Sequence, residues 1–109
     1  MTRPIKFRAW DETENEMLYD VWACPKGGWI AGLRTGRNIM QFTGLKDKNG
    51  KEIFEGDVVR EEMNQMVYEI KSQPSYFTAE ERGYRFPLYS LKYPLEIIGN
   101  IYQHPQLLR

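Results

Sequence analysis

The sequence predicts a mainly β fold, α+β at most, on three observations. Residues that break regular structure recur at short intervals, for example at residues 25–28, 49–50, 56–57 and 74–75. The segments between these breaks are short and rich in aromatic and β-branched side chains, which favour strands over helices. Helix signals are scarce, and the one capping sequence is followed closely by a glycine.

Alternation of apolar and polar side chains locates the first strand. Ile5, Phe7 and Ala9 alternate with Lys6 and Arg8. This alternation predicts a strand with one buried face and with the two cations on the other face. Further stretches have the alternation or the composition of strands. They are residues 17–21, 39–43, 52–59, 67–70 and 95–102.

The clearest turn is the polar cluster at residues 47–50, which separates two strand candidates. Asn49 and Gly50 tolerate positive φ angles, so this pair predicts a type I′ or related tight turn of a β-hairpin. A second break follows at Gly56 and Asp57. Glycine tolerates the bend that starts a strand, and the aspartate can bond nearby amides.

Helix is expected only as short turns. Thr78 and Glu81 have the Ser/Thr-x-x-Glu spacing of a capping box, but Gly83 follows so closely that only about one turn can form. Pro105 suits the first position of a second turn near the end of the chain. The sequence therefore predicts one or two short helical turns.

Three sequence motifs follow one another along the chain: KFRAWD at residues 6–11, MQFTGLKDKNGKEIFEGDVV at residues 40–59 and EIIGNIYQHPQLL at residues 96–108. Together they resemble the YopX family of phage and prophage proteins. The stretch between about residues 61 and 93 carries no motif of the family. In the last motif His104 stands where an asparagine that could cap a helix is typical.

The resemblance implies a small protein encoded by a phage or an integrated prophage. Its fold would contain a small SH3-like β-barrel with additional β-hairpins and one or two short helical turns. At 109 residues the chain is expected to be a single domain, 1–109, with a self-sufficient core. The resemblance carries over no catalytic residue, because the family has none that we can name.

Composition limits the setting in which the protein works. Fifteen basic and fifteen acidic residues give a formal net charge of zero, so no global attraction to nucleic acid or to a membrane is expected. Cys24 is the single cysteine, which excludes an internal disulfide and a cysteine-only zinc site. No apolar run approaches the roughly 20 residues of a membrane span, and the start lacks a signal peptide's hydrophobic region. The expected location is the cytoplasm of the bacterial host.

The sequence predicts a non-enzymatic protein without a cofactor or a metal. Asp47 and Asn49 have the spacing that opens a calcium loop, but Lys51 and Glu52 occupy its fifth and sixth positions, where an oxygen ligand and a glycine are needed. His104 is the only histidine, and no nucleophile elbow, phosphate loop or dinucleotide fingerprint occurs. No catalytic constellation can be assembled from these residues.

Aromatic and basic residues favour a binding role. Trp10, Trp22 and Trp29, together with seven tyrosines and five phenylalanines, exceed what a minimal barrel core needs. Residues 21–60 hold seven basic and four acidic side chains. Small β-barrels bind single-stranded nucleic acid with stacking aromatics beside a cationic groove. The sequence therefore offers a candidate surface for nucleic acid or another partner. Its residues are Arg34, Arg37, Lys46, Lys48, Lys51 and Arg60.

A protein partner is the alternative to nucleic acid. Aromatic residues and methionines, including Met63 and Met66, are enriched in interfaces and can equally cover another subunit. Small β proteins must also hide the edges of their sheets, and symmetric pairing is one solution. A homo-oligomer that makes no nucleic-acid contact, or a complex with a phage or host protein, is therefore a second hypothesis.

Overall fold

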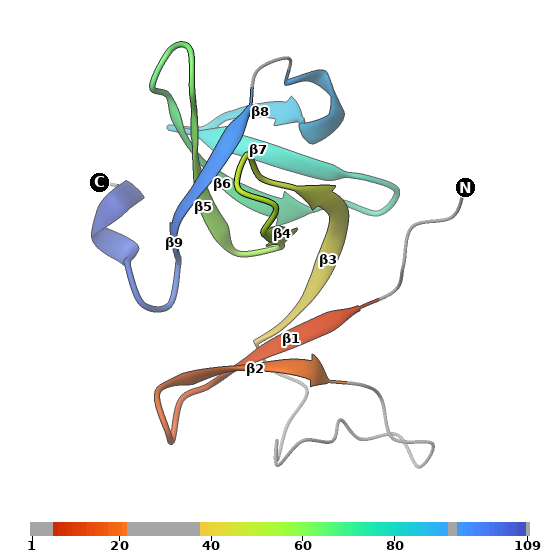
Figure 1. Cartoon of the computed structure of the whole chain (residues 1–109), viewed down its shortest axis with the longest axis vertical. Coiled ribbons are helices and arrows are strands. Elements are labelled where there is room, and N and C mark those ends of the chain that lie inside the picture. Colours follow the sequence, from red (N-terminus) through yellow and green to blue (C-terminus); the bar gives the residue numbers. More distant parts are fainter. Residues whose placement is uncertain (1–5, 22–37, 92–93, 109) are drawn as a thin grey trace.

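The computed structural model describes residues 6–21, 38–91 and 94–108 (Figure 1). The candidate residues Arg34 and Arg37, as well as Cys24, Trp22 and Trp29, lie outside the described residues. The elements of the described chain are β1 (Phe7–Asp11), β2 (Glu16–Val21), β3 (Ile39–Lys46), β4 (Glu52–Phe54), β5 (Asp57–Glu61), β6 (Val67–Ser72), β7 (Phe77–Glu81), β8 (Tyr84–Pro87), the 3-10 turn η1 (Leu88–Ser90), β9 (Leu95–Asn100) and the 3-10 turn η2 (Pro105–Leu108).

The strands form two antiparallel sheets, which confirms the mainly β prediction. The first sheet has the strand order β2-β1-β3-β4, and the second has the order β8-β7-β6-β5-β9. One of the sheets curls into a half-barrel, and in the described residues helix is limited to the short turns η1 and η2. Figure 1 shows the hairpin β1–β2 projecting away from the five-stranded sheet, with β3 running between the two.

The helical turn predicted at residues 78–81 is wrong, whereas the turn after Pro105 is confirmed as η2. Residues 77–81 form β7, which pairs with β6 on one side and with β8 on the other. Thr78 and Ala79 are completely buried in this interior strand. Pairing with a strand on each side outweighs the helix preference of the capping-box spacing, since tertiary pairing overrides local propensity.

The turn between β3 and β4 is not of type I′, because Gly50 has a positive φ of 83° but Asn49 does not. The Asp47 carbonyl accepts a hydrogen bond from the Gly50 amide at 3.0 Å, and the Asp47 amide donates to the Lys51 carbonyl at 2.7 Å. This pattern is a three-residue hairpin loop with glycine in the left-handed position. The Asp47 side chain reinforces it by accepting from the amides of Asn49 and Lys51, both at 2.9 Å.

The main core lies against the five-stranded sheet. Its buried residues are Ile53, Val59, Tyr68, Ile70, Phe77, Ala79, Leu88 and Leu95. Ile53 comes from β4 of the first sheet, so the two sheets share this core. The chain therefore passes from one sheet to the other within a few residues, at the turn between β4 and β5.

The C-terminal segment packs closely on β9. A Cβ atom at Gly99 would lie 2.7 Å from His104 Nδ1 and 2.8 Å from Leu107 Cδ1. We expect the substitution Gly99→Ala to lower the free energy of unfolding by about 2 kcal/mol, as overpacking typically does. Urea unfolding of this variant is the measurement, and Gln106→Ala, at an exposed position of the same segment, is the control. An unchanged midpoint for Gly99→Ala would show that the segment does not rest on β9.

Candidate functional site

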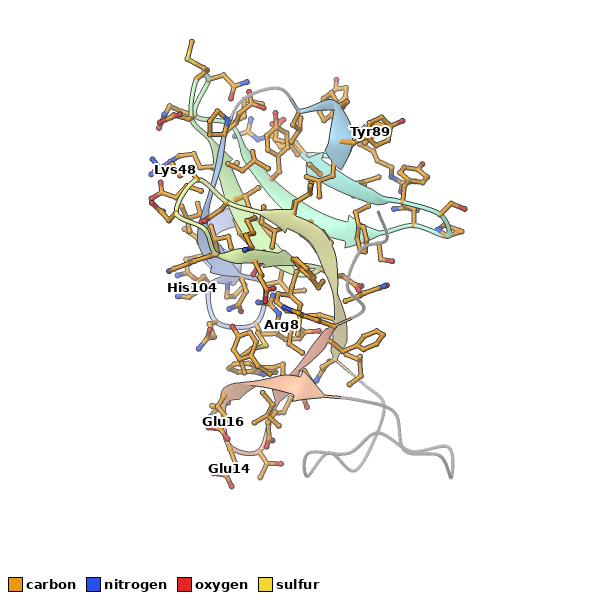
Figure 2. The ribbon with its side chains drawn as sticks, turned by 45° about the vertical axis from the view of Figure 1, so that its right-hand side comes forward. Arg8, Glu14, Glu16, Lys48, Tyr89 and His104 are labelled. Atoms are coloured by element: carbon orange, nitrogen blue, oxygen red, sulfur yellow. The ribbon has the colours of Figure 1, made fainter. Side chains whose placement is uncertain are left out.

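The described members of the predicted basic surface lie around the β3–β4 hairpin. Lys46 ends β3, Lys48 lies in the turn, and Lys51 precedes β4; all three are exposed (Figure 2 labels Lys48). Arg60 lies on β5 of the other sheet. The structure therefore gathers three of these lysines on one hairpin and places the arginine on a neighbouring strand.

Carboxylates offset part of this positive charge. Arg60 Nη2 lies 2.8 Å from Glu96 Oε1, and Lys48 Nζ lies 4.0 Å from the same oxygen and 3.8 Å from Glu62 Oε1. Lys46 and Lys51 make no salt bridge to another residue of the described chain. The described part of this surface is therefore a mixture of charges in which two lysines make no salt bridge.

Asp47 fixes the position of this hairpin. Its Oδ1 accepts hydrogen bonds from the amides of Asn49 and Lys51 in the turn. Its Oδ2 accepts a hydrogen bond from the Ile97 amide of β9 at 3.1 Å. Burial alone raises the pKa of the Asp47 carboxyl, but the three amide bonds and the charge of Lys51 outweigh burial and lower it below its usual value. The lysines are thus carried on a turn that is anchored to the second sheet.

Trp10 is not available as a stacking platform for a nucleic-acid base. It is buried, and its ring stacks on Tyr102 with ring centroids 5.7 Å apart and an interplanar angle of 12°. This contact joins the first family motif to the last. The Trp10 ring therefore packs within the fold, and any aromatic surface that binds a base must be formed by other residues.

Arg8 and Asp57 form a buried ion pair that the sequence analysis missed. Arg8 is only 3% exposed, so its predicted place on the solvent face of β1 is wrong. Its Nη2 donates to Asp57 Oδ1 at 2.8 Å and to the Glu55 carbonyl at 3.2 Å, and its guanidinium lies 4.9 Å from the ring centre of Phe54. Figure 2 shows Arg8 in the middle of the molecule, where the sheets meet.

This ion pair joins the two sheets, because β1 belongs to the first sheet and Asp57 starts β5, an interior strand of the second. Asp57 Oδ2 accepts the Phe54 amide at 2.8 Å, which closes the turn between β4 and β5. Burial raises the pKa of Asp57, and the charge of Arg8 and the Phe54 amide oppose that rise. The signal that could have revealed the pair is an arginine and an aspartate in two separate family motifs.

A second group of exposed side chains lies at the far end of the five-stranded sheet. Tyr84 is 69% exposed, Phe86 39% and Tyr89 79%. These three residues of β8 and η1 are called the β8–η1 patch below. Phe86 packs edge-to-face on the buried Tyr68, with ring centroids 6.0 Å apart, so the patch is continuous with the core. Figure 2 shows Tyr89 pointing away from the body of the molecule.

The two candidate interface methionines differ in exposure. Met63 is exposed, whereas Met66 is half-buried and packs against the core. Within residues 6–21, 38–91 and 94–108, no group of three or more His, Cys, Asp and Glu side chains could hold a metal ion. No helix of the same residues is long and apolar enough to cross a membrane.

The fold and its motifs together define a small protein of two antiparallel sheets in which the motif segments meet at the junction of the sheets. The model of the YopX protein family matches residues 24–109. The chain belongs to the YopX family, as its motifs predicted.

Two solved structures resemble this chain over nearly its whole length. Protein EF1440 from Enterococcus faecalis is 28% identical with a TM-score of 0.71, and the match covers 99% of this chain and 100% of that chain. Protein yopX from Bacillus subtilis is 22% identical with a TM-score of 0.63, and 95% of each chain is covered. The second likeness concerns the fold alone. No protein with a curated description matches the chain.

Proposed function

We propose that this protein is a non-enzymatic accessory or regulatory protein of a phage or prophage that acts in the host cytoplasm by binding. The partner that its described surface fits best is a second copy of the chain, bound at the β8–η1 patch. The observation that carries this proposal is the exposure of Tyr84, Phe86 and Tyr89 beside a sheet edge that is unpaired in the described chain.

An edge strand supports self-association because its outer amides and carbonyls have no partner strand. Among the described residues, β8 pairs with β7 only. Two β8 strands related by a two-fold axis can pair antiparallel, so that the same surface serves both subunits. Pro87, which lacks an amide hydrogen, ends β8 and limits the register of such a pairing.

The chemistry of the patch also favours a protein interface. Tyrosine and phenylalanine are enriched at the centre of interfaces, where they bury a large area at a small cost in conformational entropy. Arg85, the one charged residue of β8, is already bonded to Glu80 through its Nε at 3.1 Å. Pairing of two β8 strands therefore leaves no arginine of this strand without a counter-charge.

Light scattering of the full chain across a range of concentrations tests this proposal. We expect the mass of a dimer for the native protein and the mass of a monomer for the double variant Tyr84→Ser, Tyr89→Ser. Tyr19→Ser is the matched control, since Tyr19 is an exposed tyrosine on β2, the edge strand of the other sheet. A native protein that stays monomeric at high concentration would contradict the proposal, as would a variant that remains dimeric.

Nucleic acid is the second candidate partner, favoured by Lys46 and Lys51, which are exposed and make no salt bridge to a described residue. Phosphate contacts would centre on these two lysines; Arg34 and Arg37, the other candidates from the sequence, lie outside the described residues. We expect the double variant Lys46→Gln, Lys51→Gln to be retained less than the native protein on single-stranded DNA at low ionic strength. Lys71→Gln, whose lysine pairs with Glu80 at 3.2 Å, is the control. Equal retention of all three proteins would remove nucleic acid from consideration at this hairpin.

A further inference from the structure

The hairpin of β7 and β8 determines which backbone groups of β8 face its unpaired edge. Its loop has only two residues, Arg82 and Gly83, whose φ angles of 48° and 87° are typical of a type I′ turn. The pair that flanks such a loop, Glu81 and Tyr84, is the first hydrogen-bonded pair of the hairpin. Hydrogen-bonded and non-hydrogen-bonded pairs then alternate, so the amides and carbonyls of Tyr84 and Phe86 face β7.

Among the residues of β8, Arg85 alone presents both a free amide and a free carbonyl at the outer edge. Both groups point away from β7, and no described residue bonds to either of them. Pro87 also faces outward, but it has no amide hydrogen, and its carbonyl already accepts the Ser90 hydroxyl at 2.6 Å. The donor and the free acceptor of this edge thus belong to one residue, and that combination is self-complementary.

This self-complementarity restricts the register of two β8 strands related by a two-fold axis. With Arg85 opposite Arg85 of the partner subunit, both strands donate and accept, which gives two hydrogen bonds. Centring the pair on Phe86 would set Arg85 against Pro87, whose carbonyl is occupied and whose amide has no hydrogen. Centring it on Tyr84 would set Arg85 against Gly83, which lies in the turn and not in a strand. Only the first register joins free groups on both sides.

The same register brings aromatic side chains together across the interface. Tyr84 and Phe86 lie on the face of β8 that adjoins the core, because Phe86 is paired with the buried Ala79 and packs on Tyr68. Tyr84 then lies directly opposite the partner's Phe86, and the two-fold axis repeats this contact. Cross-strand aromatic pairs stabilise antiparallel sheets, and here both pairs continue outward from Tyr68 of the core.

We infer that the dimer is centred on Arg85, with two hydrogen bonds between the two Arg85 residues and with Tyr84 of each subunit packed on the partner's Phe86. This inference rests on the self-association proposed above and assigns its register. It also places two arginine side chains opposite each other on the outer face, where each is bonded to Glu80 of its own subunit. Repulsion between the two guanidinium groups limits the strength of the dimer and weakens as ionic strength rises.

Disulfide cross-linking in a Cys24→Ser background tests the register. Opposite residues of a non-hydrogen-bonded pair have Cα atoms about 4.5 Å apart, which suits a disulfide. We expect an equal mixture of Tyr84→Cys and Phe86→Cys proteins to form at least about tenfold more cross-linked dimer than either protein alone, because only the mixture brings two thiols together. A mixture of Tyr19→Cys and Phe86→Cys proteins is the matched control, since Tyr19 is exposed on β2 of the other sheet, and it should not cross-link.

Each alternative register has its own outcome in this experiment. Cross-linking of the Tyr84→Cys protein alone would show a register centred on Tyr84, and cross-linking of the Phe86→Cys protein alone would show one centred on Phe86. Either result overturns the inference, as does a mixture that does not cross-link although the native protein is dimeric by light scattering. A native protein that is monomeric by light scattering would instead contradict self-association itself, and the register with it.

The arginine pair gives a second test that needs no cysteine. We expect Arg85→Thr to lower the dissociation constant of the dimer about threefold at low ionic strength, because it removes two like charges that face each other. Sedimentation of the full chain measures this constant. Lys71→Gln is the control and should leave it unchanged, since Lys71 also pairs with Glu80, at 3.2 Å, but lies on the interior strand β6. An Arg85→Thr dimer that is no tighter than the native dimer would overturn the inference.

Discussion

Replacing Arg8 with methionine is expected to lower the free energy of unfolding by about 3 to 5 kcal/mol, because it leaves the Asp57 carboxylate buried without its partner. Arg8 is 3% exposed and Asp57 is 2% exposed, so water cannot compensate for the lost contact. Methionine keeps most of the apolar contact that the arginine stem makes, which isolates the loss of charge. Urea unfolding measures the effect.

A double-mutant cycle separates the ion pair from other effects. Asp57→Asn removes the negative charge, and the variant with both changes should be more stable than the sum of the two single losses predicts. Arg82→Met, at an exposed arginine with no salt bridge to a described residue, should stay within about 0.5 kcal/mol of the native protein. Additive losses in the cycle would show that Arg8 and Asp57 do not interact directly.

Replacing Asp47 with alanine is expected to lower the free energy of unfolding by about 3 kcal/mol. Three backbone amides lose their acceptor at once, those of Asn49 and Lys51 in the turn and that of Ile97 on β9. An amide that is left without an acceptor has lost part of its hydration on folding with no hydrogen bond to replace it. Hydrogen bonds to a charged acceptor are also stronger than bonds to a neutral one. Asp47→Asn is the matched variant, and it should lose less because its carbonyl oxygen can still accept the two amides of the turn.

The pH dependence of these variants supplies an independent check. The folded-state pKa of Asp47 is lowered, so its stabilising contribution is complete above its unfolded value of about 3.8 and is lost as pH falls through the folded value. The difference in stability between the native protein and Asp47→Asn should therefore be largest at neutral pH and should shrink as pH falls below the unfolded value of about 3.8. A difference that does not change with pH would show that Asp47 is not an ionised acceptor in the folded protein.

Local patterns were sufficient to predict most strands. The stretches 39–43, 52–59, 67–70 and 95–102 all fall largely on strands of the structure. Their alternation and their turn residues act over a few positions, so they can be read without knowing the tertiary fold. Thr78 shows the limit of such patterns, since β6 and β8 decide its conformation from either side.

The buried polar contacts could not be predicted from local patterns. Arg8 lies 49 residues from Asp57, and an arginine on an alternating strand is usually solvated. Glu96 is 36 residues from Arg60, so its effect on the predicted basic surface also depends on the fold. Arg8 and Asp57 meet at the junction between the two sheets, whereas Arg60 and Glu96 lie opposite each other on the paired strands β5 and β9 of the second sheet.

The family motifs are explained by this junction. The first motif contributes Arg8 and Trp10, the second Asp47 and Asp57, and the last Ile97 and Tyr102. Their contacts with one another are the Arg8–Asp57 ion pair, the Trp10–Tyr102 stack and the bond from the Ile97 amide to Asp47. The motifs thus describe how the sheets are joined, and the proposed partner surface lies elsewhere, on β8 and η1.

Amide hydrogen exchange at low and at high protein concentration tests the central proposal most directly, that two copies associate through β8. We expect the amides of residues 84–86 on β8 to exchange more slowly as concentration rises, while those of the exposed edge strand β2 do not change. Slower exchange should be absent from the double variant Tyr84→Ser, Tyr89→Ser. Exchange on β8 that is independent of concentration would contradict self-association at this edge.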